Sequence, residues 1–253
     1  MSRNLSYSAL TLRVKPSGGV LGGPAREAWF LTSEEGIIHA TVFGGPKSRL
    51  RSLVAPFHSG ILHIYHDPVR NSSKVSEFDV TSYRTGLREL WERAMTAGAA
   101  AETILASHGG GGAWAEALKL AENVLDALDT SDAALSSRIG IHFLWQWAKI
   151  LGVRPDLSAC ASCGGEAGQA RTLWYSPNSE ALLCENCKNE TSPESSFRLG
   201  PGAMQWLKAT GPVPPQALSR ISLDAPSLEQ ARAFTKAVMA AALGKRLPTW
   251  DEI

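Results

Sequence analysis

Two pairs of cysteines are the residues in this chain whose type and spacing most clearly predict a chemistry. Cys160 and Cys163 form one Cys-x-x-Cys pair, Cys184 and Cys187 form the second, and 20 residues separate the pairs. A Cys-x-x-Cys turn can direct two thiolates at one ion, so two facing turns complete a tetrahedral site of four sulfurs. Zn²⁺ favours such a site, and four protein ligands leave no open position for a substrate water. The spacing therefore predicts one structural zinc ion per chain.

Other uses of the four cysteines fit the sequence less well. Disulfides need an oxidising compartment, and residues 1–5 (MSRNL) do not begin an apolar signal segment. A redox pair needs one Cys-x-x-Cys only, whereas two matched pairs, with Gly164 and Gly165 after the first, suit a metal-binding turn. A catalytic zinc is disfavoured because no His or carboxylate replaces a thiolate and no His-x-Glu precedes the cysteines. An iron-sulfur cluster and an empty or decayed site stay open as alternatives.

Length and composition bound the remaining possibilities. The chain has 253 residues, 44% of them hydrophobic, which suffices for one large domain or two small ones. No apolar run approaches the ~20 residues of a membrane-spanning helix, so we expect a soluble, cytoplasmic protein without membrane partners. The net charge is +1, but residues 1–80 hold 9 Lys/Arg against 6 Asp/Glu. A polyanion is therefore expected to bind the first third of the chain.

Residues 1–80 are predicted to fold as a small β-barrel. Apolar and polar residues alternate with period 2 in five short runs, and turn-forming segments separate them, including the glycine-rich segment 16–24. Five strands joined by hairpin-like turns favour a closed barrel, with the OB-fold as the leading candidate. The five runs lie near residues 9–14, 28–32, 37–43, 61–65 and 74–80.

From residue 81 the apolar period becomes helical, which predicts a helical domain over residues 81–253. In the first helix, Leu87, Leu90 and Trp91 begin a stripe that is expected to face a core. The third helix is apolar almost all round, so it is expected in the middle of a bundle, with Ser131 or Asp132 as its cap. Helices are predicted at about 87–106, 114–128, 132–151, 202–209 and 227–243.

The expected fold class is α+β, with the strands first and the helices after them. An OB-fold-like barrel precedes an α-helical domain, and a four-cysteine zinc knuckle is inserted at about residues 157–190.

A basic segment between two predicted strands is the candidate for nucleic-acid contact. Lys47, Arg49 and Arg51 lie close together, and no acidic residue occurs from residue 36 to residue 66. On a barrel loop these cations can neutralise phosphates. Arg13, Lys15 and Arg26 are expected to extend this positive patch. A phosphate loop is excluded, because Pro46 stands before Lys47 where that motif requires glycine.

No pattern in the chain predicts catalysis. There is no Gly-x-Ser-x-Gly elbow, and His63 and His66 are three apart on a predicted strand, which puts them on opposite faces. We therefore expect a protein without enzymatic activity. The barrel aromatics are each expected in the barrel core, although an exposed one can stack on unpaired bases. They are Tyr7, Trp29, Phe30, Phe43, Phe57, Tyr65 and Phe78.

The order of these parts resembles the RecO family of bacterial DNA repair proteins over nearly the whole chain. The most specific stretch is LGVRPDLSACASCG, residues 151–164, followed by Trp-Tyr-Ser-Pro at 174–177 and Leu-Cys-Glu-Asn-Cys at 183–187. Residues 31–38 and 45–48 resemble the second hairpin and the basic loop of the family. The family often has two glycines before the third cysteine, where this chain has Glu180-Ala181-Leu182-Leu183. We expect Ser179 and Glu180 to form that turn instead.

The resemblance implies a recombination mediator rather than an enzyme. Proteins of this family bind single- and double-stranded DNA, anneal complementary strands and work with RecR. They also engage single-stranded-DNA-binding protein and help RecA to load onto the coated strand, which implies a cytoplasmic, nucleoid-associated protein. The acidic tail of that partner needs an apolar groove beside a cation, for which the helical part offers Arg138, Lys149 and Arg154. The alternative function is a protein-interaction scaffold with a structural zinc and weak nucleic-acid binding.

Overall fold

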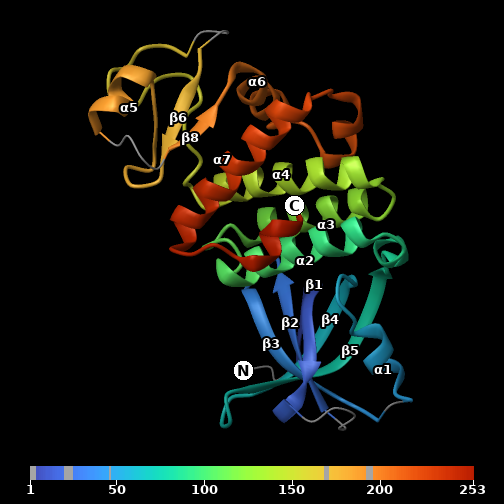
Figure 1. Cartoon of the computed structure of the whole chain (residues 1–253). Coiled ribbons are helices and arrows are strands. Elements are labelled where there is room, and N and C mark those ends of the chain that lie inside the picture. The colour runs from blue at the N-terminus through green and yellow to red at the C-terminus, as the bar shows by residue number, and fades with distance from the viewer. Residues whose placement is uncertain (1–3, 20–24, 46, 168–170, 192–195) are drawn as a thin grey trace. The chain divides into compact units, whose positions relative to one another are not determined.

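The structure, a computed structural model, describes most of the chain in two compact units (Figure 1). The first unit comprises residues 1–89 and 101–129, and the second comprises residues 90–100 and 130–253. These units are defined by compactness and not by independent folding. The predicted division into domains 1–80 and 81–253 therefore stays a prediction. The described residues are 4–19, 25–45, 47–167, 171–191 and 196–253. Residues 20–24 of the predicted glycine-rich segment, and Pro46 of the basic segment, lie outside them.

The first unit contains a closed five-stranded barrel, as predicted. Its strand order is β1-β2-β3-β5-β4, and β1 also pairs with β4, which closes the sheet. All pairs are antiparallel except β3 with β5, which meet in parallel through Thr41 and Lys74. This order confirms the OB-like barrel. The strands are β1 (Asn4–Pro16), β2 (Ala25–Thr32), β3 (Gly36–Phe43), β4 (Ser59–Asp67) and β5 (Ser72–Ser82).

Alternation along the strands builds the barrel core. On β3, the buried side chains of Ile38, Ala40 and Val42 alternate with residues that point outward. Phe30 on β2 and Phe78 on β5 meet edge to face inside the barrel, with ring centroids 5.9 Å apart. The other members of this buried cluster are Tyr7, Ala9, Ala28, Val54, Leu62, Ile64 and Val75.

Helical segments complete the first unit. The short helix α1 (Arg49–Leu53) lies between β3 and β4, inside the segment predicted as a loop. Helix α3 (Trp114–Leu128) packs against β1 and β2. Arg84 is buried, and its Nε donates to Asp126 of α3 at 2.6 Å, which ties the end of the barrel to this helix. The unit also contains the 3₁₀ turns η1 (Ser17–Gly19) and η2 (Thr85–Arg88) and the last residues of α2 (Trp91–Ala106).

The predicted core stripe of the first helix is correct at Leu87 and wrong at Trp91. Leu87 is 1% exposed, although it lies in η2 rather than in the helix, whereas Trp91, the first residue of α2, is 65% exposed. The buried face of α2 lies at other positions. That face contains Ala97, Ala100 and Ile104 instead.

The core of the second unit is built around α4 (Ala133–Ile150), as its composition predicted. Phe143 and Trp147 of α4 are fully buried and stack with ring centroids 5.5 Å apart. The Asp132 side chain accepts a hydrogen bond from the Leu135 backbone at 2.7 Å, which confirms one of the two expected caps. The remaining elements around α4 are α6 (Pro201–Thr210), η3 (Pro215–Arg220), α7 (Ala225–Leu243) and η4 (Pro248–Glu252).

The cysteine segment contains a small antiparallel sheet of order β7-β6-β8 and the helix α5 (Glu185–Thr191). Its strands are β6 (Leu173–Ser176), β7 (Ala181–Leu183) and β8 (Phe197–Leu199). Strand β8 lies beyond residue 190, the predicted end of the insert, and it packs on α7. The sheet therefore joins the knuckle to the helices of the same unit. None of the helices in the described part of the chain is long and apolar enough to cross a membrane.

Candidate metal centre and nucleic-acid interface

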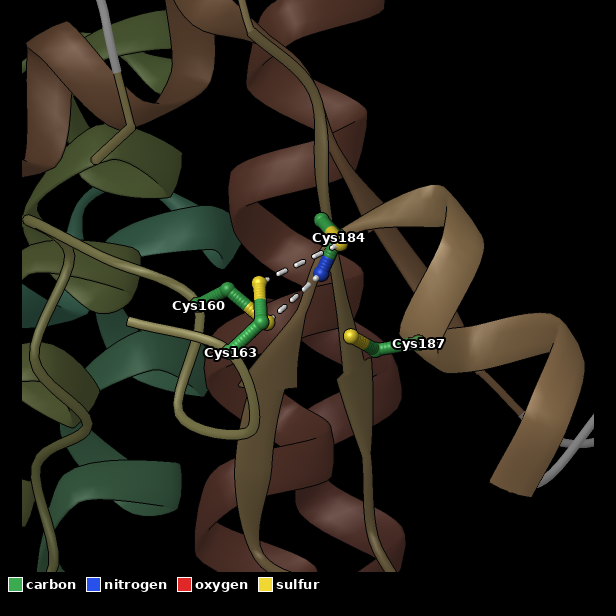
Figure 2. Close-up of side chains that lie close together, drawn as sticks. All are labelled: Cys160, Cys163, Cys184 and Cys187. Carbon is green, nitrogen blue, oxygen red and sulfur yellow. Dashed lines mark hydrogen bonds between the residues drawn. The ribbon is translucent and has the colours of Figure 1, made fainter. Parts of the chain in front are cut away.

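The four cysteines converge on one point, as Figure 2 shows. Their sulfur atoms all lie within 4.8 Å of one another, and the Sγ atoms of Cys163 and Cys184 are 3.9 Å apart. Four sulfurs at the ~2.3 Å bond length of tetrahedral zinc lie about 3.8 Å from one another. The cluster therefore has the size of a tetrahedral metal site. No disulfide joins any of the four cysteines, so the two-disulfide alternative is not the arrangement seen here.

Two local turns aim the thiols. In the first, the backbone N–H of Gly164 donates to the Cys160 carbonyl at 2.9 Å, and Gly164 has a positive φ of 68°, which glycine adopts without strain. In the second, Cys184 follows β7 and Cys187 lies on α5, where the Lys188 N–H donates to the Cys184 carbonyl at 2.9 Å. The turn before Cys184 includes Glu180 at a φ of 51°. Glu180 thus takes the left-handed conformation expected for a position that is often glycine.

Hydrogen bonds and burial shift the pKa values of the thiols. Burial opposes ionisation of Cys160, but backbone donors from Cys163, Cys184 and Ser162 outweigh it and lower its pKa to about 6. A hydrogen bond from Ser162 favours the Cys187 thiolate, yet the three neighbouring sulfurs and burial raise its pKa to about 12. Four thiolates this close need a cation among them to ionise together. The donor set therefore fits a divalent, thiophilic metal ion.

On the barrel, the predicted basic segment divides into exposed and buried cations. Lys47 and Arg49 are exposed, the first just before α1 and the second at its start. Arg51 is 9% exposed, and its Nη1 donates to the Gly44 carbonyl at 3.1 Å. Arg51 thus holds the turn that follows β3, and its burial removes it from the residues we propose for phosphate contact.

The other three predicted cations lie on β1 and β2. Arg13 and Lys15 are exposed on β1, and the Lys15 Nζ lies 3.5 Å from Glu27 and 4.7 Å from the centroid of the Trp29 ring. Arg26 is half-buried on β2, where it pairs with Pro16 and Val42 in the strand register. Lys15 therefore lies on the same outer face as Trp29.

Of the seven barrel aromatics expected in the core, Tyr7, Phe30 and Phe78 lie in the buried cluster, whereas Phe57 and Tyr65 are half-buried outside it. Trp29 and Phe43 point outward: Phe43 is 49% exposed, and Trp29 is half-buried on the outer face of β2. The signal was present in the sequence, because Val42 and Phe30 face inward and their neighbours on a strand must face outward. The prediction placed Trp29 and Phe43 in the core because they are aromatic, although the alternation of side chains along the strands puts them outside.

In the second unit, two of the three predicted cations border a hollow. Lys149 and Arg154 line a cavity of about 590 Å³ together with Trp145, Leu157, Leu207 and Lys208. The Arg154 guanidinium lies over the Trp145 ring, 5.0 Å from its centroid. Arg138 is elsewhere, and its Nη1 donates to the backbone carbonyls of Leu218 and Ile221 at 3.4 and 3.3 Å. Arg138 therefore stabilises the end of η3.

A second group of possible metal ligands lies outside both sites. His63 Nε2 and Asp79 Oδ2 are 3.2 Å apart across β4 and β5, and Glu77 is close by. The other ring nitrogen of His63 hydrogen-bonds the Ser6 hydroxyl at 2.8 Å. The His66 ring lies elsewhere and hydrogen-bonds the Ser73 hydroxyl at 3.2 Å. These exposed side chains satisfy one another on the barrel surface.

Comparison with known proteins identifies the family. Residues 88–251 match the family model described as "Recombination protein O C terminal". The chain is 26% identical over 168 residues to the DNA repair protein RecO of Rubrobacter xylanophilus, covering 66% of this chain and 65% of that protein. It is 38% identical over 60 residues to the DNA repair protein RecO of Symbiobacterium thermophilum, covering 23% of each. The chain thus matches less than two thirds of either relative's length. Because the family model covers more than half of the chain, the chain belongs to the RecO family.

Proposed function

We propose that this chain is a non-enzymatic recombination mediator in DNA repair. It binds single- and double-stranded DNA without sequence preference, anneals complementary strands and, with RecR, helps RecA to load onto coated single strands. It acts in the cytoplasm, at repair sites on the nucleoid. Membership in the RecO family together with a closed OB-type barrel that carries exposed cations supports this proposal most directly.

Phosphate contact is proposed at Lys47 and Arg49. Both side chains are exposed, and no carboxylate occurs in the sequence from residue 36 to residue 66. Glu77 and Asp79 of β5 line the same hollow as Arg49, so Lys47 is the cation of this pair with fewer acids beside it. Arg13 and Lys15 on β1, with Arg26 on β2, extend the positive surface of the barrel. Phosphate contacts carry no sequence information, which suits a protein that must act at any gap or break.

The salt dependence of binding tests this assignment. Changing Lys47 and Arg49 together to Ala should weaken binding to unrelated DNA sequences equally. It should also reduce the slope of log K against log salt by about 1.5 units, because each lost phosphate contact contributes about 0.7–0.9. The matched control changes two exposed cations of the second unit, Arg220 and Lys245, and should leave the slope unchanged. No salt-dependent DNA binding by the unaltered protein would favour the scaffold alternative.

The cavity beside Lys149 and Arg154 is proposed as the site for the acidic tail of single-stranded-DNA-binding protein. Pro155 and Pro212 offer apolar surface there, next to the buried Leu157 and Leu207. Lys149, Arg154 and Lys208 outnumber Asp156 at its border, which matches the charge of a tail that ends in a carboxylate. The Trp145 ring orients the Arg154 guanidinium at this border.

Charge reversal tests the tail site. Arg154→Glu should weaken binding of a tail peptide to the full chain by about tenfold or more, because it replaces an attraction with a repulsion. Arg220→Glu, at an exposed position of the same unit, serves as the control. Equal peptide affinity in the two variants would move the tail site away from this cavity.

The four-cysteine cluster is proposed to hold one structural zinc ion through Cys160, Cys163, Cys184 and Cys187. Zinc bound there would cross-link the turn at Cys160 to β7 and α5. Elemental analysis of protein purified without chelator should find one zinc per chain. Iron with visible absorption would identify an iron-sulfur cluster instead.

A further inference from the structure

The outer face of the barrel carries a ladder of flat side chains with lysines over them. Trp29 pairs with His39 between β2 and β3, and their rings stack with centroids 4.6 Å apart and planes 27° apart. Phe43, at the end of β3, is 49% exposed. Residues 39, 41 and 43 alternate with the buried core positions of β3, so His39 and Phe43 share the outward face.

Trp29 and Phe43 each have a cation beside the ring, and the His39 Nε2 lies 3.9 Å from the Glu27 carboxylate. The Lys15 Nζ lies 4.7 Å from the centroid of Trp29, and the Lys74 Nζ lies 5.3 Å from the centroid of Phe43. Strand register places these groups in adjoining rows, because Glu27 is opposite both Lys15 and Thr41, and Thr41 is opposite Lys74. The platform defined by Trp29, His39, Phe43, Lys15 and Lys74 thus crosses four neighbouring strands.

We infer that this platform stacks the unpaired bases of a single-stranded nucleic acid, while Lys15 and Lys74 turn to the adjacent phosphates. The inference rests on the proposed function, since it assigns base contacts to a surface next to the proposed phosphate contacts. Phe43 stands four residues before Lys47, so the platform runs directly into the basic segment. His39 and Phe43 are about 13 Å apart along β3, at ~3.3 Å per residue, which separates two stacking positions along one extended strand.

The chemistry of the face selects a single strand over the other polyanions and over a protein. Every unpaired base has a free π-face, so stacking is independent of sequence, whereas duplex bases are already stacked on their neighbours. An apolar protein partner would need a continuous apolar patch, but here the rings alternate with Lys15, Lys74 and the exposed Arg13. Glu27 is an acid in these rows, and its carboxylate already lies between Lys15 at 3.5 Å and His39 at 3.9 Å.

A comparison of ligands tests the inference without changing the protein. The full chain is titrated with a fluorescent 20-nucleotide oligo-dT and with an abasic strand of the same length and charge. Stacking contributes about 5- to 150-fold in affinity per base, so oligo-dT should bind at least about tenfold more tightly than the abasic strand. Equal affinity for the two strands would overturn the inference.

Substitution then locates the stacking surface. Trp29→Leu with Phe43→Leu keeps apolar side chains but removes the flat rings, and both positions lie outside the barrel core. The double variant should lose at least about tenfold in oligo-dT affinity. Its affinity for the abasic strand and for a duplex should change by less than about twofold. The control is Trp91→Leu, which removes a 65% exposed tryptophan from the second unit and should bind like the unaltered chain.

The outcomes separate this inference from the proposed function. If the unaltered chain binds abasic and dT strands equally with a steep salt slope, DNA binding stands and base stacking fails. If it binds no nucleic acid at all, both fail. If the Leu double variant keeps its dT affinity but loses a protein partner, the face is a protein-docking surface and the inference is wrong.

Discussion

The barrel and the cysteine knuckle are held together by different means. The barrel closes on itself through strand pairing, and a cluster of buried aromatic and aliphatic side chains fills it. The knuckle has strands of three or four residues and four converging thiols. Strands this short bury little apolar surface, so they need a cross-link to persist. The outer surface of the barrel is consequently available for binding, whereas the proposed role of the knuckle cysteines is structural.

Removal of the metal should produce the largest effect and should act on the knuckle alone. Structural zinc sites contribute on the order of 10 kcal/mol to the folding of the segment that holds them. A chelator, or Cys184→Ser, should therefore abolish amide-exchange protection over residues 157–191 and lower the zinc content to zero. Amides of β1–β5 should keep their protection, and added zinc should restore the unaltered chain. If chelation also removed amide-exchange protection from β1–β5, the barrel would depend on the metal, which would contradict this account.

Truncation inside the barrel is the converse experiment. Phe30→Ala removes a fully buried ring that meets Phe78, and should lower the free energy of unfolding by about 3–5 kcal/mol. The matched control is Trp29→Ala, the next residue on the same strand, which points outward and should cost clearly less. Denaturant melts followed by signals from the barrel measure both variants. Both should retain one zinc per chain, and a Phe30→Ala protein that loses zinc would show that the knuckle depends on the barrel.

A smaller, pH-dependent effect should come from the helices rather than from either of these regions. His142 of α4 is 1% exposed, and its Nδ1 has no hydrogen-bond partner among the described residues. Burial lowers its pKa to about 4, so the folded protein holds it neutral while the unfolded chain takes up a proton near pH 6.5. Its stabilising contribution is complete above about pH 6.5 and is lost as the pH falls toward 4, by about 3 kcal/mol in total.

Comparison with His142→Leu separates this loss from acid release of the metal. The variant should show a shallower fall in the free energy of unfolding between pH 6.5 and pH 4, measured on zinc-loaded protein. Identical pH profiles for the two proteins would assign the whole acid sensitivity to other groups, such as the cysteine thiols.

The fold could be predicted from the sequence where a pattern is local and repeated. Strand alternation in Ile38, Ala40 and Val42 located β3, and the apolar composition around Phe143 located the central helix. The spacing of the four cysteines was sufficient to predict that their sulfur atoms lie close together. The short strand β8 was not predicted, because three residues carry too little periodicity and its pairing partner is distant in the sequence.

The candidate binding surface was less predictable for a physical reason. Charge alone cannot tell Arg51, which bonds the Gly44 carbonyl, from Arg49, which is exposed, because the difference depends on the turn made by α1. Likewise, Trp29 and Phe43 have the composition of core residues and only their register places them outside. The residue type predicts which ligands a side chain can bind, and the strand register determines whether that side chain is exposed to a ligand.

Photocrosslinking tests the central claim that DNA binds on the barrel most directly. Oligo-dT carrying 5-iodouracil is irradiated on the unaltered full chain, and mass spectrometry locates the linked peptides. Crosslinks should fall on β2 and β3, at or beside Trp29 and Phe43, with the strand continuing to Lys47. Crosslinks confined to residues 130–253 would contradict the account and would place the DNA on the helical unit.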